Sequence, residues 1–149
     1  MTGLSPYIWV IVITWLGAHA VKYALALAKG KQLNFKKQVF VSGGMPSAHV
    51  ATATALTAVI AFIDGMPSGL FALSALMTLI IAHDALRVRR SSGEQGEALI
   101  RIIKETGSKA KVPLVAKGHV PSEVIAGVLF GIMCGIVVYW VYLATLRVS

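Results

Sequence analysis

The sequence predicts an all-α integral membrane protein: a bundle of about four transmembrane helices, with a short amphipathic helix in the third connection. Hydrophobic residues make up 56% of the 149 residues and charged residues only 13%, with a mean hydropathy of +0.75. An ordinary soluble domain carries about 25% charged residues. The apolar residues also gather in long runs, and a helix that spans a bilayer needs about 20 of them. We therefore expect residues 1–149 to form a single membrane domain.

Four apolar runs cover about residues 6–28, 46–63, 70–86 and 120–146. The second and third are short for a bilayer span, and the fourth is long enough to tilt. Breaker residues from Asp64 to Gly69 predict a tight turn between the second and third helices. In the third connection, Ser91 or Ser92 could cap an amphipathic helix that runs from Gly93 to about Glu105. Such a helix could lie on the membrane surface or pack onto the bundle.

The positive charge is concentrated in two of the connections. Twelve of the fourteen Lys and Arg residues lie between residues 29 and 37 or between residues 87 and 117. With four helices, both connections emerge on one side, which the positive-inside rule makes cytoplasmic. This placement argues against nucleic acid as the partner and for a multi-pass protein whose termini lie outside. Some of these cations could also bind a phosphate group.

Ionisable residues inside the apolar runs gather at the same side of the membrane. Following the alternating helix directions places all of them at the face that carries the basic connections: His19, Lys22, His49, His83, Asp84, His119 and Glu123. Titratable groups inside membrane helices are costly and usually functional. Snorkelling of the side chain to water would explain the position of Lys22 near a helix end, and also that of His19. It does not account for four histidines and two acids on one side, so we expect a functional site there.

The first segment whose residues could take part in binding or catalysis runs from Ser42 to His49. Gly43 and Gly44, followed by a Pro and a Ser at a helix start, offer free backbone N–H groups and the positive end of a helix dipole. This pattern predicts an anion cradle that His49 faces. Ser47 could either cap the helix or donate to a phosphate oxygen.

The second segment runs from His119 to Glu123. Pro121 suits a first helical turn, and the four-residue spacing places His119 and Glu123 on one side of it. A carboxylate bonded to one imidazole nitrogen leaves the other free to act as a nucleophile. The two histidines and the carboxylate could also bind a metal. Because the crowded cations would oppose one, we expect neither a metal nor a cofactor.

A stripe of small residues predicts close helix packing in the fourth helix. Gly127, Gly131 and Gly135 repeat a small-xxx-small spacing, and Ala51 and Ala55 form part of a matching stripe on the second helix. The glycine face is also a candidate surface for a homo-oligomer.

Both segments resemble motifs of the type 2 phosphatidic acid phosphatase and vanadium haloperoxidase superfamily. Residues 46–49, Pro-Ser-Ala-His, are similar to its P-S-G-H motif, and residues 119–127 are similar to its H-x-P-S-D-V-x-A-G segment, with Glu123 for Asp. Together with residues 84–90, the compact layout looks most like the small divergent branch of that superfamily. The resemblance covers roughly residues 36–135.

The resemblance implies a metal-independent phosphatase that acts on a lipid or isoprenoid phosphate, for example phosphatidylglycerol phosphate. His119 would form a phosphohistidine, Glu123 would orient it, and His49 would protonate the leaving alcohol. The superfamily's first motif, a Lys followed by Arg-Pro, has no match upstream of Gly43. Its Ser-Arg pair should lie seven and six residues before His119, where this sequence has Val112 and Pro113. Other residues must then bind phosphate. The candidates are Arg89, Arg90, Arg87, Lys37, Lys117, Ser47, Gly43 and Gly44. Asp84 would organise the arginines beside it.

Two other classes of function fit the same residues. A small bundle could bind or transport an anionic lipid without any chemistry, which the basic face and the glycine stripe would suit. A purely structural membrane subunit would need neither histidine beyond its contribution to stability. Substitution of His119 separates these functions from an enzyme, because an enzyme would lose turnover and keep some binding.

Overall fold

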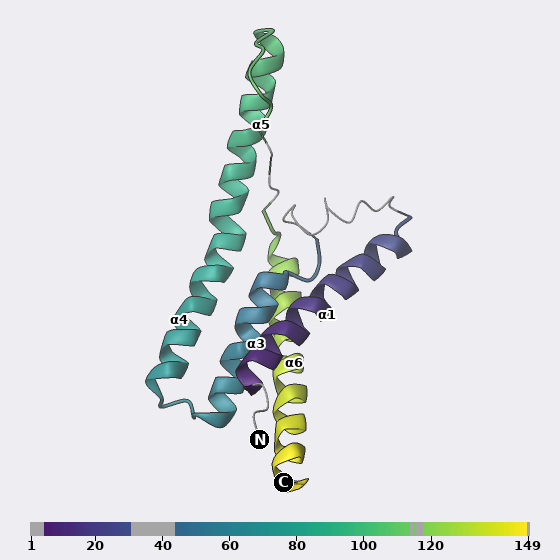
Figure 1. Cartoon of the computed structure of the whole chain (residues 1–149). Coiled ribbons are helices and arrows are strands. Elements are labelled where there is room, and N and C mark those ends of the chain that lie inside the picture. The colour runs from purple at the N-terminus through teal and green to yellow at the C-terminus, as the bar shows by residue number, and fades with distance from the viewer. Residues whose placement is uncertain (1–4, 31–43, 114, 116–117, 149) are drawn as a thin grey trace.

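The computed structural model describes residues 5–30, 44–113, 115 and 118–148 (Figure 1). These residues form helices and no strands, which confirms the prediction of a helical membrane protein. The elements are α1 (Pro6–Ala28), α3 (Ala48–Ile63), α4 (Gly69–His83), the π-helical turn η1 (Asp84–Val88), α5 (Arg89–Glu105) and α6 (Pro121–Val148). Among the described helices, three are long and apolar enough to cross a membrane: Pro6–Ala28, Gly69–Glu105 and Pro121–Arg147.

The second apolar helix, α3, is shorter than the three helices that are long enough to cross a membrane. α3 begins at Ala48 because Pro46 and Ser47 are not helical, and Ser47 is extended with φ −68° and ψ 109°. Its 16 residues span about 24 Å, less than the roughly 30 Å of a hydrocarbon core. α3 is therefore too short to cross the whole hydrocarbon core.

The predicted amphipathic helix of the third connection is present as α5 and ends at Glu105 as expected, but it does not begin where the sequence predicts. No break or cap occurs at Ser91 or Ser92, because the helix that starts at Gly69 continues through η1 into α5 and ends at Glu105. The π turn absorbs one extra residue, so that Arg89 N donates to Asp84 O five residues earlier. The resulting 37-residue helix is about 55 Å long. α5 is thus neither a separate surface helix nor part of the bundle, and it projects beyond α1, α3 and α6 (Figure 1).

The bundle is organised around α3, which contacts α1, α4 and α6. The glycines of α6 face α3, as the small-residue stripes predict. A Cβ added at Gly127 would lie 2.8 Å from Ser47 O, and one added at Gly135 would lie 2.8 Å from Ala58 Cβ. Since α3 covers this face, a second copy of the chain cannot pack there without displacing α3. The glycine face therefore serves contacts within the chain, and its predicted use in a homo-oligomer has no support.

The two ends of the bundle differ in chemistry. α1 begins and α6 ends at the same end of the bundle as the connection between α3 and α4 (Figure 1). There the Tyr7 hydroxyl donates to Asp64 Oδ2 at 2.6 Å and joins α1 to that connection. The N-terminal ends of α3 and α6 lie at the opposite end. This end therefore carries the two segments that the sequence marks as candidates for binding or catalysis.

Candidate functional site

Backbone hydrogen bonds hold the two chemically important segments together. Ser47 N donates to Glu123 O at 3.0 Å and ties the start of α3 to the first turn of α6. His119 N donates to Ala85 O at 3.1 Å and ties the residue before α6 to the π turn. A π turn interrupts the regular α-helical ladder, which makes a carbonyl such as that of Ala85 available to another segment. The site is therefore built where α3, η1 and α6 meet.

His119 and Glu123 form the central pair of this site. His119 Nδ1 lies 2.7 Å from Glu123 Oε2, and the His119 side chain is 3% exposed. The same carboxylate oxygen accepts from Val120 N at 3.4 Å. An ionised carboxylate can only accept, so this contact places the imidazole proton on Nδ1 and leaves a lone pair on Nε2. Among the described residues, Nε2 has no hydrogen-bond partner, which suits a nucleophile.

His49 lies in the first turn of α3 and its side chain is exposed at the same end of the bundle. It interacts electrostatically with His119, Arg89, Lys22 and His19. These groups come from α1, α5 and the segment before α6. The structure thus brings the two predicted histidines and one of the predicted arginines into one electrostatic environment. His19 also makes an edge-to-face contact with Trp15, at 4.5 Å between ring centroids.

Lys22 is the residue whose burial sequence reasoning missed. Snorkelling to water would leave it exposed, yet its side chain is only 8% exposed. A Cβ added at Gly44 would lie 3.7 Å from Lys22 Cγ and Cδ, so the lysine passes directly beside the predicted anion cradle. Lys22 also interacts electrostatically with Glu123. The sequence already places Lys22 at the same membrane face as the four histidines, and this placement could have indicated that it lies beside the site.

The contacts of Lys22 leave its charge available for a ligand. No ion pair or hydrogen bond joins it to any residue in the described parts of the chain. A buried ammonium without a direct counter-charge is costly, so such a group usually has a partner. A bound anion beside Gly44 would provide one.

Ser47 carries a second unsatisfied polar group at this point. Its side chain is fully buried, and Ser47 Oγ has no hydrogen-bond partner among the described residues. Ser47 occupies the N-cap position of α3, but its hydroxyl makes no hydrogen bond to the first turn of that helix. Buried hydroxyls are nearly always satisfied in folded proteins. Gly44, at φ +84°, precedes it in a left-handed conformation that suits glycine.

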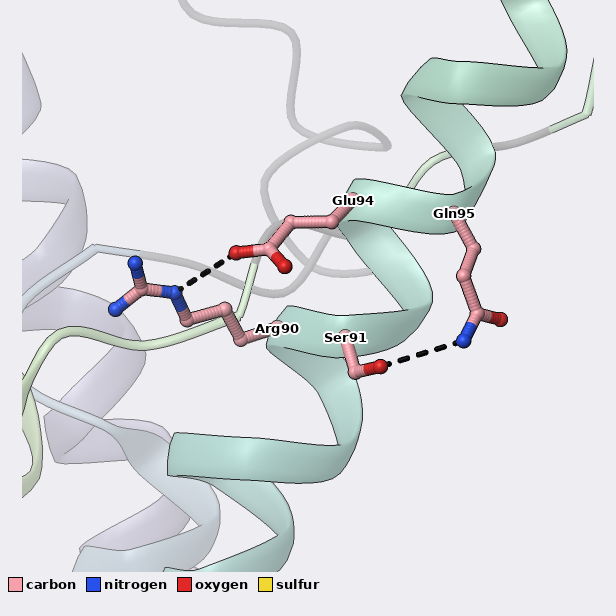
Figure 2. Close-up of polar contacts among 4 residues, drawn as sticks. All are labelled: Arg90, Ser91, Glu94 and Gln95. Carbon is pink, nitrogen blue, oxygen red and sulfur yellow. Dashed lines mark hydrogen bonds and ion pairs between the residues drawn. The ribbon is translucent and has the colours of Figure 1, made fainter.

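The structure separates the predicted arginines. Arg89 Nε pairs with Asp84 Oδ2 at 2.6 Å, and this arginine interacts electrostatically with His49. Arg90 Nε instead pairs with Glu94 at 3.1 Å, and both side chains are about two-thirds exposed (Figure 2). Arg87 is exposed and forms no ion pair with any residue in the described parts of the chain. Arg89 is thus the arginine that the fold brings near the histidines.

Three of the predicted phosphate ligands lie outside the described residues: Gly43, Lys37 and Lys117. His83, at the end of α4, is exposed. Gly118, which precedes His119, packs tightly on the backbone of Arg90, because an added Cβ would lie 2.5 Å from Arg90 N. This close approach sets the position of His119 against the long helix.

Comparison with known proteins places this site in a family. The model of the divergent PAP2 family matches residues 5–134, which include Lys22, the start of α3, the π turn and the His119–Glu123 pair. The chain belongs to the divergent PAP2 family. It is also 32% identical over 144 residues to the uncharacterized membrane protein YuiD of Bacillus subtilis (strain 168), covering 85% of this chain and 89% of that protein. No solved structure matches the chain.

Membership of the divergent PAP2 family confirms the resemblance seen in the two sequence segments. It makes the chain a phosphatase-related integral membrane protein. The family match begins at residue 5 and therefore includes α1, which the resemblance between motifs did not cover.

Proposed function

We propose that this protein is a metal-independent phosphatase that hydrolyses a lipid or isoprenoid phosphate through a phosphohistidine. The observation that carries this proposal is the buried His119, whose Nδ1 lies 2.7 Å from Glu123 while Nε2 has no partner among the described residues. A nucleophilic histidine needs this arrangement, because the carboxylate fixes the tautomer and stabilises the cation that forms during attack.

The reaction follows from the two histidines in two displacements. In the first, His119 Nε2 attacks phosphorus, a P–N bond forms, and the P–O bond to the alcohol breaks while protonated His49 gives its proton to the leaving oxygen. In the second, neutral His49 takes a proton from water, the hydroxide oxygen attacks phosphorus, and the P–N bond breaks. Inorganic phosphate leaves, and both histidines return to their starting states.

Three groups are suited to stabilise the phosphoryl oxygens during these displacements. Lys22 supplies a buried positive charge, Ser47 Oγ supplies an unsatisfied donor, and Arg89 supplies a guanidinium oriented by Asp84. Preorganised donors of this kind in a poorly solvated site are worth about 10²–10³-fold each in rate. They take the place of the superfamily cations that this sequence lacks.

The substrate is expected to be an amphiphile because of the depth of the site. The helices expose apolar side chains along most of their length, whereas the charged groups gather at one end. A lipid tail would lie along the helices and its phosphate would reach the N-terminal end of α3. Phosphatidylglycerol phosphate, phosphatidate and isoprenoid phosphates or diphosphates all meet this requirement. The basic connections favour a cytoplasmic orientation of this face.

The test is phosphate release by the purified protein in detergent with a chelator present. Wild type would be measured against a panel of lipid phosphates beside His119→Ala and His49→Ala. We expect release by wild type, none by His119→Ala, and a rate lowered by about 10²–10⁴-fold for His49→Ala, the usual contribution of a general acid.

Binding of the same lipids by His119→Ala separates an enzyme from a binding protein. An enzyme variant without its nucleophile should retain lipid and lose turnover. Absence of release from every substrate, by wild-type protein that is folded and binds the lipids, would contradict the proposal and favour headgroup binding or transport.

A further inference from the structure

His19 is a titratable residue at the site end of the bundle that the two displacements do not use. It lies on α1 one turn before Lys22, and the three-residue spacing places both side chains on the same side of that helix. Ala18 packs against Ala48 of α3, and the residues that follow them, His19 and His49, interact electrostatically. The half-buried His19 ring therefore borders the site from the α1 side.

The level of His19 in the membrane is apolar. Val21, Leu25 and Leu27 lie nearer than His19 to the C-terminal end of α1, and all three are exposed. Exposed apolar side chains on a spanning helix face lipid, so the hydrocarbon continues past this level. An imidazole is too short to reach water beyond these residues, so snorkelling does not explain His19. Polar groups at such a level are costly and usually have a partner and a function.

The described parts of the chain provide no hydrogen-bond partner for the ring nitrogens of His19. The contact that its ring makes there is with Trp15, one turn earlier, at 4.5 Å between ring centroids and 63° between ring planes. An edge-to-face contact orients the imidazole but offers it no oxygen or nitrogen acceptor. Because at least one imidazole nitrogen carries a proton in either charge state, His19 presents a free donor to a ligand.

The depth of His19 selects the part of a substrate that it would meet. In the proposed reaction the phosphate lies beside Lys22 and His49 protonates the leaving oxygen, so the first carbons of the alcohol continue towards the apolar level of His19. Three residues separate His19 from Lys22 along α1, which is about 4.5 Å. In a glycerolipid phosphate the ester carbonyls lie a few bonds from the leaving oxygen, and they accept hydrogen bonds. An isoprenoid phosphate has only hydrocarbon at this level, which would leave the imidazole unpaired.

We propose that His19 is a specificity residue that donates a hydrogen bond to an ester carbonyl of a glycerolipid phosphate. Lys22 and His119 would bind any lipid phosphate, whereas His19 favours those with an acceptor just below the phosphate. A site that hydrogen-bonds a substrate group discriminates against an analogue without that group, because the polar residue of the site is then unpaired. This inference rests on the proposed phosphatase site and narrows its substrate class to glycerolipid phosphates.

Substrates that differ only in their carbonyls test the contact. Phosphatidate and its dialkyl ether analogue carry the same phosphate and chains of equal length, and farnesyl phosphate is the isoprenoid reference. We expect wild type to show a kcat/KM for the ester about three- to ten-fold above that for the ether, the contribution of one neutral hydrogen bond. In His19→Phe, which keeps a ring beside Trp15, the ratio should fall to about one.

Two further variants control for the shape and position of the new side chain. His19→Gln restores an N–H donor and should recover part of the preference for the ester. Ala20→Phe places the same phenyl ring at the neighbouring exposed position and should keep the wild-type ratio of ester to ether. A fall of the ratio in Ala20→Phe equal to that in His19→Phe would contradict a specific contact with His19.

Binding separates failure of this inference from failure of the proposed function. In a His119→Ala background, which removes the nucleophile, competition between phosphatidate and its ether analogue in mixed micelles should show the same preference, and adding His19→Phe should remove it. An ester preference that survives His19→Phe, or wild type without such a preference, would overturn the role of His19. Absence of phosphate release from every substrate, with the binding preference intact, would instead contradict the phosphatase and support recognition by His19.

Discussion

A methyl group added at Gly118 should strongly lower the proposed phosphatase activity by moving His119. The added Cβ would lie 2.5 Å from Arg90 N and 2.6 Å from Arg90 Cα, both of them backbone atoms of a helix that cannot yield as a side chain would. Ordinary contact begins at 3.4 Å, so the segment before α6 must retreat by about 1 Å. His119 N would then lose its 3.1 Å bond to Ala85 O. A displacement of about 1 Å at a reacting group costs on the order of 10²-fold in rate.

The assay compares phosphate release by Gly118→Ala with release by Gly69→Ala. At Gly69 an added Cβ meets no atom within 4 Å, so this variant should keep the wild-type rate. We expect kcat of Gly118→Ala to fall by about 10²-fold and its melting temperature in detergent to drop, because overpacking typically costs about 1–3 kcal/mol. A fully active Gly118→Ala would refute the claim that this contact positions His119.

Three further substitutions test separate parts of the site and fold. Lys22→Met should lower kcat/KM by about 10²–10³-fold without lowering the melting temperature, because it removes a buried charge that has no direct partner among the described residues; unfolding of the variant would show a structural role instead. Glu123→Gln should reduce turnover by about 10³-fold or more while lipid binding persists, since an amide can bond His119 in the wrong tautomer. Gly131→Val should lower the free energy of unfolding by about 1–3 kcal/mol, measured by detergent titration, because its side chain meets the Ala51 carbonyl of α3; an unchanged stability would contradict the packing described.

Those features of the fold that depend on composition and spacing could be predicted from the sequence. The helical membrane class follows from the apolar runs, and α1 occupies the predicted residues 6–28. The contacts of Gly131 with Ala51 and of Gly135 with Ala55 follow from the small-residue stripes on the two helices. The four-residue spacing of His119 and Glu123 predicts the side that they share, and their 2.7 Å contact agrees with it.

Other features depend on tertiary contacts that no local pattern reveals. Ser91 and Ser92 are acceptable helix caps, but the preceding helix continues through them because the π turn at Asp84–Val88 absorbs an extra residue. From the sequence, Lys22 is interpreted as a snorkelling residue, whereas the fold buries it beside Gly44. The distinction between Arg89 and Arg90 likewise arises from their partners, Asp84 and Glu94, and not from their adjacent positions in the sequence.

Trapping of the covalent intermediate tests the central claim most directly. Wild-type protein would be mixed with phosphatidate labelled with ³²P, quenched in alkali within the first turnover, and digested, with His119→Ala treated in parallel. The mechanism predicts acid-labile, alkali-stable label on the peptide that contains His119 and none in the variant. Turnover of the lipid by wild type without any label on this peptide would contradict a phosphohistidine at His119.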